Sequence, residues 1–203
     1  MTDINKSNNN RVLEQISSAI SNVILKEDFS IQFKNGNFEL FLNKPNILKV
    51  AKAIKDHEKL KFNQFIDLTS VDYPNKKNRF QMVYVFLSVE FNCRLLIKFF
   101  INEKGSVDSL TSIFPASNWY EREVWDLFGI TFNNHPDLRR LLTDYGFIGH
   151  PLRKDFPLSG NVEVKYDLKT KKVIYEPVKL TQTFRDFDFE SPWKGENLNK
   201  NNE

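Results

Sequence analysis

The chain contains a single cysteine, Cys93, among its 203 residues. One cysteine cannot close an intrachain disulfide or supply the four thiolates of a typical iron–sulfur cluster. Cys93 begins an apolar run, so we expect a buried and unreactive thiol there. The cysteine count therefore excludes a disulfide scaffold and an iron–sulfur cluster held by this chain alone.

Long hydrophobic runs are also missing. The longest, Met82–Val89, is far shorter than the roughly 18 to 20 residues that a membrane-spanning helix needs, and it reads as a strand. We therefore expect no direct membrane span. The N-terminal residues MTDINKSNNNR show neither an apolar secretory core nor an amphipathic transit pattern, so we expect the protein to work in the compartment where it is made.

Neither sign of charge dominates, because 29 basic and 26 acidic residues give a formal net charge of +3. We therefore expect no nucleic-acid partner. The sequence has no Gly-rich phosphate cradle, no GxSxG elbow and no HExxH motif. His135 and His150 stand fifteen residues apart without a cysteine or carboxylate at metal-ligand spacing. We predict no catalytic, cofactor-binding or metal-binding residues.

Hydrophobic periodicity predicts an α+β fold. A helix from Arg11 is followed by a hairpin turning at Asn35-Gly36, and Pro45 opens a second helix with its apolar stripe at Ile47, Leu48, Ala51 and Ile54. Strands are predicted at Phe65–Val71, Phe80–Val89, Arg94–Ile101 and Val107–Phe114, before a short helix at Asn118–Phe128. This order favours a two-layer sandwich, a mixed and largely antiparallel sheet with helices on one face.

The segment from Glu121 to Gly160 differs in composition from the rest. It holds four of the eight arginines but only one of the twenty-one lysines, together with four of the seven glycines. Arginine offers a rigid fork of donors, so its concentration indicates contacts in which geometry matters. We predict a disordered N-terminus over 1–10, an α+β domain over 11–128, an ordered arginine-rich loop over 129–160 and an extended tail over 161–203. The tail includes one possible hairpin, Val162–Asp167 against Val173–Val178.

Two glutamates near the start of this segment invite an acid/base reading. Glu121 and Glu123 would point roughly 200° apart on a helix, however, so they cannot face one substrate. Arg122 and Asp126 stand four residues apart, which leaves open a local surface pair or a buried pairing. Each histidine precedes a proline and is expected to bond a carbonyl or a carboxylate. Asp144 and Asp155 are expected to pair with arginines or to form turns.

With these residues the chain resembles the C subunit of the proton-pumping NADH:quinone oxidoreductase, respiratory complex I, the 30 kDa subunit family. The family signature is ERE, two residues, an acid, two apolar residues, six residues, a histidine, three residues, an arginine, one residue and two apolar residues. Every position is satisfied by Glu121, Arg122, Glu123, Asp126, Leu127, Phe128, His135, Arg139, Leu141 and Leu142. The similarity extends over about Ala116 to Trp193.

The resemblance implies a non-catalytic peripheral-arm subunit that packs on the D subunit of the quinone-binding module, in an enzyme that transfers electrons from NADH to quinone and translocates protons. Flavin mononucleotide and iron–sulfur clusters would belong to partner subunits. The chain would associate peripherally with the inner membrane, on the cytoplasmic side in a bacterium or the matrix side if it is encoded in an organelle. The expected interface residues are Glu121, Arg122, Glu123, Asp126, His135, Arg139, Arg140, His150, Arg153, Asp155, Phe187 and Trp193.

Two other readings stay open from the residues alone. One is a stand-alone hydrolase in which Glu121, Arg122, His135 and His150 converge in a cleft. The other is a small RNA-binding protein, although the tail is neutral and no RNA-binding signature is present. For the preferred reading, we expect Arg139, Arg140 and Arg153 to pair with carboxylates or carbonyls inside the loop and across the boundary with the D subunit.

Overall fold

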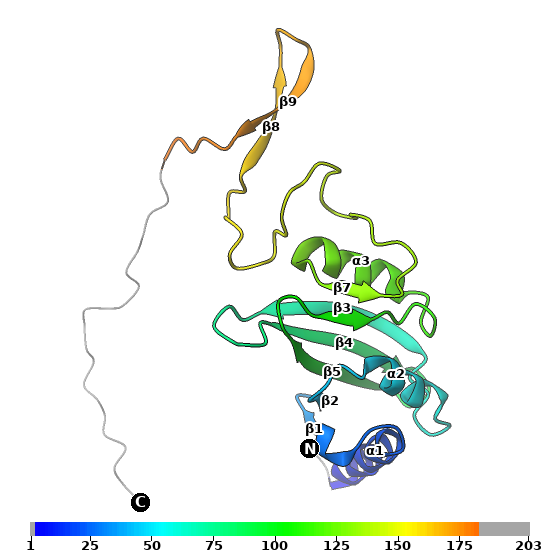
Figure 1. Ribbon diagram of the computed structural model, residues 1–203. Coiled ribbons are helices and arrows are strands. Elements are labelled where there is room, and N and C mark those ends of the chain that lie inside the picture. Colours follow the sequence, from blue (N-terminus) through cyan, green and yellow to red (C-terminus); the bar gives the residue numbers. More distant parts are fainter. Residues whose placement is uncertain (1–2, 183–203) are drawn as a thin grey trace, which may run out of the picture. The chain divides into compact units, whose positions relative to one another are not determined.

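The computed structural model describes residues 3–182, and side chains are described from residue 9 onward. The described residues divide into two compact units, one that ends at Leu158 and one that begins at Ser159. The first unit contains a five-stranded sheet, three α-helices and a second, two-stranded sheet (Figure 1). In the second unit, the described residues form a two-stranded hairpin.

The five-stranded sheet has the strand order β1-β2-β5-β4-β3. Its strands are β1 Phe29–Lys34, β2 Asn37–Leu42, β3 Gln64–Asp72, β4 Phe80–Ser88 and β5 Cys93–Ile101. All neighbouring strands pair antiparallel except β2 and β5, which pair parallel. The predicted mixed, largely antiparallel sheet is therefore confirmed.

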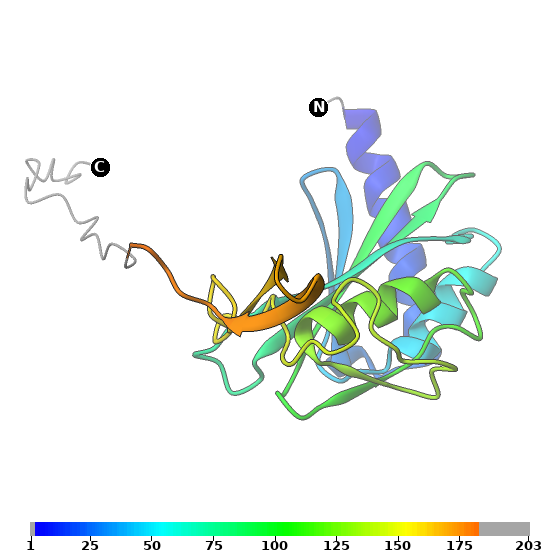
Figure 2. The ribbon, with the colours of Figure 1, turned by 90° about the horizontal axis from the view of Figure 1, so that it is seen from above.

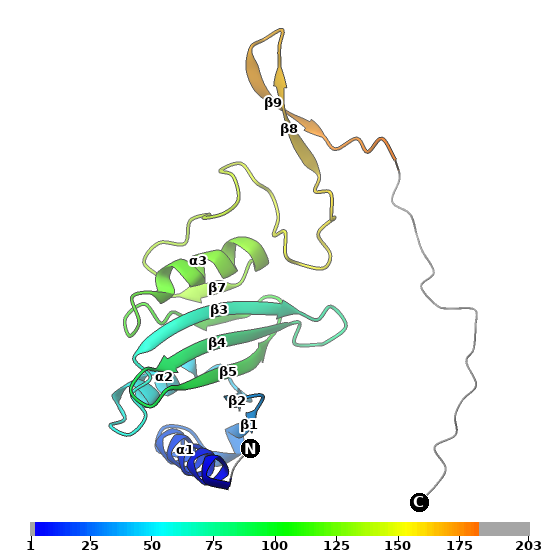
Figure 3. The ribbon, with the colours of Figure 1, turned by 180° about the vertical axis from the view of Figure 1, so that it is seen from behind.

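Three α-helices pack on one face of this sheet. They are α1 Asp3–Ser21, α2 Ile47–Asp56 and α3 Ser117–Phe128, and a short 3-10 helix, η1 Lys26–Asp28, precedes β1. Alternate residues of β4, namely Phe80, Met82, Tyr84 and Phe86, are fully buried in the same core as the apolar residues of the helices. The intervening residues of β4 are only half-buried. Figure 2 shows α2 and α3 on the same side of the strands, and Figure 3 shows β3, β4 and β5 from the opposite side.

Two short strands complete the first unit and position the end of α3. β6 Ser106–Asp108 and β7 Thr131–Asn133 pair parallel, so they hold together the chain segments that enter and leave α3. In the second unit, β8 Val162–Asp167 and β9 Lys172–Pro177 pair antiparallel, which agrees with the hairpin predicted there.

The sequence signals for turns and helix ends are confirmed at two positions. Asn35 and Gly36 both have positive φ, 51° and 80°, which is the backbone that a tight hairpin turn between β1 and β2 requires. Gly129 follows α3 with φ 77°, and its N–H bonds the carbonyl of Trp125 at 2.8 Å. Both glycines therefore lie where the left-handed region is needed.

Three local predictions differ from the structure. α1 begins at Asp3, inside the segment predicted to be disordered, because adding turns to an existing helix costs less than nucleating one. The predicted strand Val107–Phe114 ends at Asp108, since the backbone turns where the N–H of Phe114 bonds the carbonyl of Leu110 at 2.7 Å. In α2, Val50 belongs to the buried stripe, whereas Leu48, which was expected there, is only half-buried.

Cys93 is half-buried rather than fully enclosed. Burial raises the pKa of its thiol to about 11, so the thiolate is scarce near neutral pH. The expected burial of this residue is thus only partly met.

Candidate functional site

Asp126, near the end of α3, organises the loop that follows. Its side chain is fully buried, and its Oδ2 accepts hydrogen bonds from the backbone N–H groups of Leu141, Leu142 and Thr143 at 2.9, 2.8 and 3.0 Å. Its Oδ1 accepts from the hydroxyl of Thr143 and from Arg140 Nη1, the latter at 2.7 Å. Burial alone would raise the pKa of Asp126, but these hydrogen bonds outweigh it and hold the pKa well below its usual range. The carboxylate is therefore ionised and fully engaged.

Arg140 links Asp126 to the later part of the loop. Besides Asp126, its guanidinium donates to the carbonyl of Gly149 at 3.1 Å. It lies 5.8 Å from the ring of Trp125 and 5.5 Å from the ring of Phe147. Donating to a carboxylate and a carbonyl at once while stacked on aromatic faces suits the planar guanidinium rather than an ammonium. This contact explains why arginine, and not lysine, occupies position 140.

Residues 150–153 cap the C-terminal end of α3. Helix ends leave carbonyl groups without intrahelical partners. Here His150 Nδ1 donates to the carbonyl of Asp126 at 2.9 Å, the N–H of Leu152 donates to the carbonyl of Leu127 at 3.1 Å, and Arg153 Nε donates to the carbonyl of Phe128 at 2.5 Å. Burial lowers the pKa of His150, which keeps the ring neutral. The expectation that the histidines bond carbonyls is thus confirmed for His150.

A second carboxylate network fastens the end of the loop to the sheet. Asp72, at the end of β3, has a fully buried side chain, and Arg79 donates to both its oxygens at 2.7 and 2.8 Å. Asp72 also accepts from the backbone N–H of Lys154 at 2.7 Å, and Asp155 lies 2.9 Å from Arg79. Glu103 pairs with both Arg79 and Arg153, at 3.1 and 3.3 Å. The sheet thus anchors residues 153–155.

Glu121 and His135 pair in the interior beneath α3. Both side chains are fully buried, with Glu121 Oε2 at 3.8 Å from His135 Nε2. Glu121 Oε1 accepts the N–H of Leu110 at 2.7 Å, and the His135 ring lies between the carbonyl of Asn118 and the N–H of Asp137, at 3.2 and 3.1 Å. Since His135 Nδ1 accepts from a backbone N–H, the proton lies on Nε2. The pair ties α3 to the segments before and after it.

Burial raises the pKa of Glu121. Folding therefore favours its protonated form, so the stability that this group contributes is complete below the unfolded pKa and is lost as pH rises through the folded value. We expect Glu121→Gln, which keeps the acceptor for Leu110, to gain stability relative to the native chain between pH 5 and pH 8. Urea unfolding at both pH values measures this difference, with the exposed change Glu90→Gln as the control. A relative loss with rising pH would contradict the burial argument.

Gly129 is the residue around which α3 and its cap meet. A Cβ here would lie 2.6 Å from the His150 ring and 2.7 Å from Arg153 Nη2, in addition to the strain of its positive φ. We expect Gly129→Ala to destabilise the chain by at least about 2 kcal/mol. Gly36→Ala is the matched control, because its φ is also positive but no atom lies within 4 Å of the added carbon. Urea unfolding of both variants separates the steric cost from the cost of the positive φ. Equal losses of unfolding free energy would mean that His150 and Arg153 move aside without cost.

The remaining predicted residues lie nearer the surface. Arg122 donates to the carbonyls of Arg139 and Arg140 at 3.2 and 3.3 Å. Of the two alternatives left open for Arg122 and Asp126, the local surface pair is therefore not formed, because Asp126 bonds Arg140 and the backbone. Arg139 pairs with Asp137 at 2.7 Å but is 75% exposed. Glu123 is half-buried on α3. The tail residues Phe187 and Trp193 lie outside the described residues.

The four residues of the hydrolase reading do not form an accessible site. Glu121 and His135 come together but are enclosed, while His150 bonds the C-terminal end of α3 and Arg122 bonds loop carbonyls. In the described part of the chain, no group of three His, Cys, Asp or Glu side chains could hold a metal ion. The network holds a loop in shape. Sequence reasoning missed Arg79, Asp72 and Glu103, although Arg79 directly follows Lys76-Lys77-Asn78 and marks another switch from lysine to arginine.

While Asp126, Arg140 and Arg153 turn inward, the loop exposes four of its large apolar residues. Leu142 is 62% exposed, Tyr145 101%, Ile148 87% and Leu158 91%. This is the reverse of the usual arrangement, in which apolar side chains are buried and charged ones are solvated. We call these four residues the apolar rim. Large apolar side chains that stand in solvent on one loop make this loop a candidate interaction surface.

Comparison with known proteins adds a family match. The family model for the 30 kDa subunit of respiratory-chain NADH dehydrogenase matches residues 40–162. The NADH-ubiquinone oxidoreductase subunit 9 of Reclinomonas americana is 45% identical over 97% of both chains. The C subunit of the NADH-quinone oxidoreductase of Paramagnetospirillum magneticum is 48% identical over 90% of both, and that of Methylobacterium radiotolerans is 52% identical over 79% of this chain and 74% of its own.

Solved structures share the fold. One of them is a chain of the membrane-bound sulfane sulfur reductase, an archaeal respiratory membrane complex, with a TM-score of 0.62 and 23% identity. The match covers 74% of this chain and 86% of that one. At this identity the match supports the fold.

Proposed function

This chain belongs to the 30 kDa subunit family of respiratory-chain NADH dehydrogenase, and we propose that it works there as a packing and assembly subunit without catalytic residues of its own. It is the C subunit of complex I, in the peripheral arm of the NADH:quinone oxidoreductase. No helix among the described residues is long and apolar enough to cross a membrane. Its place on the cytoplasmic or matrix side is part of the proposal.

The apolar rim is the observation that carries this proposal. Four large side chains stand in solvent on a loop whose backbone is fixed by Asp126, Arg140 and Arg153. Fully burying one such side chain is worth about 1.5 to 3 kcal/mol, and a fixed loop loses little entropy when it binds. We propose that the rim packs on the D subunit of the quinone-binding module.

Eight of the twelve interface residues predicted from the sequence then divide into two roles. Glu121 and Asp126 have fully buried side chains, so they would reach no partner without unfolding the loop. They, with His135, Arg140, His150 and Arg153, set the shape of the loop. Exposed residues such as Arg139 and Asp155 are available for direct contact with a partner.

The β8–β9 hairpin supports a second contact with the same partner. The register places Val162, Val164, Tyr166, Val173, Tyr175 and Pro177 on one face, all of them exposed. The opposite face is mostly charged and includes the ion pair between Lys165 and Glu176 at 3.3 Å. A two-stranded hairpin is marginally stable alone in water, so an apolar partner surface would stabilise this face. We propose that it extends the interface with the D subunit.

The oxidation and reduction steps are assigned to other subunits. We propose that flavin mononucleotide and the iron–sulfur clusters are held by partners, since this chain offers one half-buried cysteine. Titration of the purified chain with the purified D subunit, alongside an NADH oxidation assay of the chain alone, tests the proposal. Binding without turnover is expected. Turnover by the chain alone, or no binding to the D subunit, would overturn it.

A further inference from the structure

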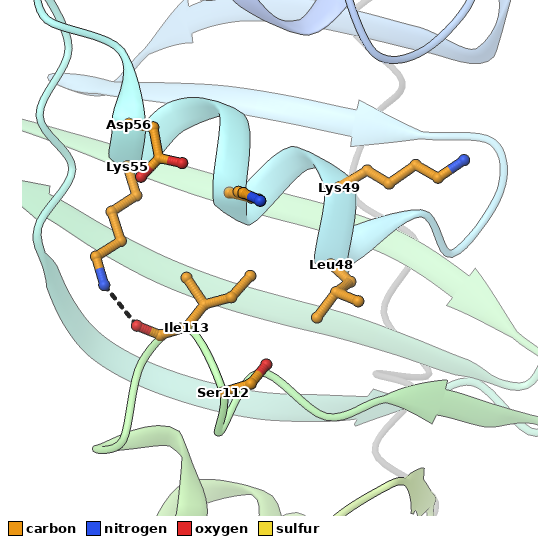
Figure 4. Close-up of a pocket in the computed structure, with 7 residues that line it drawn as sticks. Leu48, Lys49, Lys55, Asp56, Ser112 and Ile113 are labelled. Atoms are coloured by element: carbon orange, nitrogen blue, oxygen red, sulfur yellow. Dashed lines mark hydrogen bonds between the residues drawn. The ribbon is translucent and has the colours of Figure 1, made fainter.

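A groove of about 490 Å³ lies between α2 and the turn at residues 110–114. It is lined by Leu48, Lys49, Lys52, Lys55, Asp56, Ser112 and Ile113, and we call it the α2 groove. Figure 4 shows Leu48 and Lys55 extending from α2 toward Ile113 on the turn. Its floor is therefore apolar and its helix side is basic.

Lys55 fixes the shape of this groove. Its Nζ donates to the carbonyl of Ile113 at 2.6 Å, the contact dashed in Figure 4, and lies 4.8 Å from the centre of the Phe114 ring. The contact links α2 to a turn 58 residues further along the chain. The groove is thus formed before any partner arrives, which reduces the ordering cost of binding.

The other two lysines of the groove have no ion-pair partner within the described part of the chain. Lys49 and Lys52 are three residues apart on α2, so they lie on the same side of the helix. The segment 44–61 holds six lysines and two acidic residues, whereas the rest of the chain holds 23 basic and 24 acidic residues. Three of these six lysines, Lys49, Lys52 and Lys55, line the groove, whereas Lys44 and Lys61 pair with Asp28 and Glu90.

We propose that the α2 groove receives an acidic segment of another subunit of the same enzyme. A carboxylate placed near Lys49 and Lys52 would complement their charges, and a neighbouring apolar side chain would cover Leu48 and Ile113. Asp56 supplies a negative charge at the same groove, which suits a peptide of mixed charge and opposes a polyphosphate backbone. A peptide thus fits both the charge pattern and the apolar floor. This contact uses residues separate from the apolar rim, and it rests on the proposed membership of the assembled enzyme.

Carbodiimide cross-linking of the intact enzyme tests the proposal. The reagent first adds to a carboxyl group. The lysine amine then attacks the activated carboxyl carbon to form an amide, and the carbodiimide leaves as a urea that has taken up the water lost in the coupling. Mass spectrometry is expected to find Lys49 or Lys52 joined to an Asp or Glu of another subunit. Joining only to Asp56 or Glu58 of this chain, or no joining while Lys77 and Lys104 react, would overturn the proposal.

Charge reversal gives a second, independent measurement. We expect Lys49→Glu with Lys52→Glu to lower the amount of assembled enzyme on native gels about tenfold, while the isolated chain stays folded. The control is Lys77→Glu with Lys104→Glu, which makes the same change of charge on exposed residues of other turns. Normal assembly of the α2 variant would overturn the proposal. Equal binding of the native and variant chains to the D subunit would leave the proposal for the apolar rim unaffected. The two proposals can therefore be tested independently of each other.

A membrane surface is the competing occupant of the α2 groove. The same variants distinguish it from a protein partner. Vesicles containing anionic phosphatidylserine are mixed with the native chain and with the α2 variant at low salt. If the native chain binds the vesicles, the α2 variant does not, and no cross-link to another subunit is found, the occupant of the groove is a lipid headgroup and the proposal is wrong. Equal binding of both chains, together with the cross-link, supports the acidic segment.

Discussion

Replacing Asp126 by asparagine is expected to lower the free energy of unfolding of the isolated chain by about 3 to 5 kcal/mol. The buried carboxylate accepts three backbone N–H groups on one oxygen, and a hydroxyl and Arg140 on the other. An amide has only one acceptor oxygen, and its NH₂ group would face donors. Arg140, with a side chain only 19% exposed, would also lose its counter-charge.

Urea unfolding measures this loss, and Asp137→Asn is the control. Asp137 also pairs with an arginine, Arg139, but that pair is exposed to solvent, so its removal should change stability little. Limited proteolysis of the folded variant should cut near residues 141–149, where the backbone has lost its acceptor. A loss below about 1 kcal/mol with an intact loop would mean that Asp126 does not hold the loop.

The change of stability at acid pH tests the role of Asp126 in a second way. Because the hydrogen bonds lower the pKa of Asp126, its contribution is present above the unfolded pKa and is lost as pH falls through the folded value. Asp72 acts in the same direction, because its hydrogen bonds from Arg79 lower its pKa. We expect the stability of Asp126→Asn to fall less steeply on acidification than that of the native chain. This trend is opposite to the one expected for Glu121.

Placing charge on the apolar rim is expected to remove binding without unfolding the chain. Tyr145→Lys with Ile148→Lys should leave the free energy of unfolding within about 0.5 kcal/mol, because both side chains are already in solvent. If the rim packs on the D subunit, the same variant should bind that subunit at least about a hundredfold more weakly, equivalent to roughly 2.7 kcal/mol. Titration calorimetry with the purified D subunit gives this number directly.

The control for the rim variant changes exposed apolar residues elsewhere. Leu25→Lys with Val89→Lys introduces the same charge at positions that are 71% and 65% exposed and lie outside the loop. If the control weakens binding as much as the rim variant, net charge rather than the rim governs the contact. If neither variant weakens it, the rim is not the contact surface.

The sequence predicts the scaffold well where a local signal decides the backbone. Asn35-Gly36 and Gly129 need positive φ, and the hairpin and the end of α3 lie where those residues placed them. The segment Val107–Phe114 misled because its apolar residues suit a strand, while the structure buries Leu110 and Phe114 from a turn. Periodicity reports which side chains prefer burial, and it does not report the backbone path that buries them.

The candidate site was predictable in its residue types and not in its pairing. Arginine enrichment identified the loop, but Arg139, Arg140 and Arg153 looked equivalent. Only the structure separates the exposed pair of Arg139 from the buried carboxylate contact of Arg140 and the helix cap of Arg153. Asp72 reaches the backbone N–H of Lys154 across 82 residues, a distance over which sequence carries no local signal. The apolar rim was likewise hidden, because exposure depends on that long-range network.

The position of β5 has a consequence for synthesis of the protein. β5 lies at the centre of the sheet, between β2 and β4, yet it is the last of the five strands to leave the ribosome. Until residue 101 has been made, β1–β2 and β3–β4 are separate hairpins whose facing edges have no partner. Unpaired strand edges on a partly made chain are prone to aggregation. We therefore expect the sheet edges of a nascent chain to need protection between translation of β4 and completion of β5.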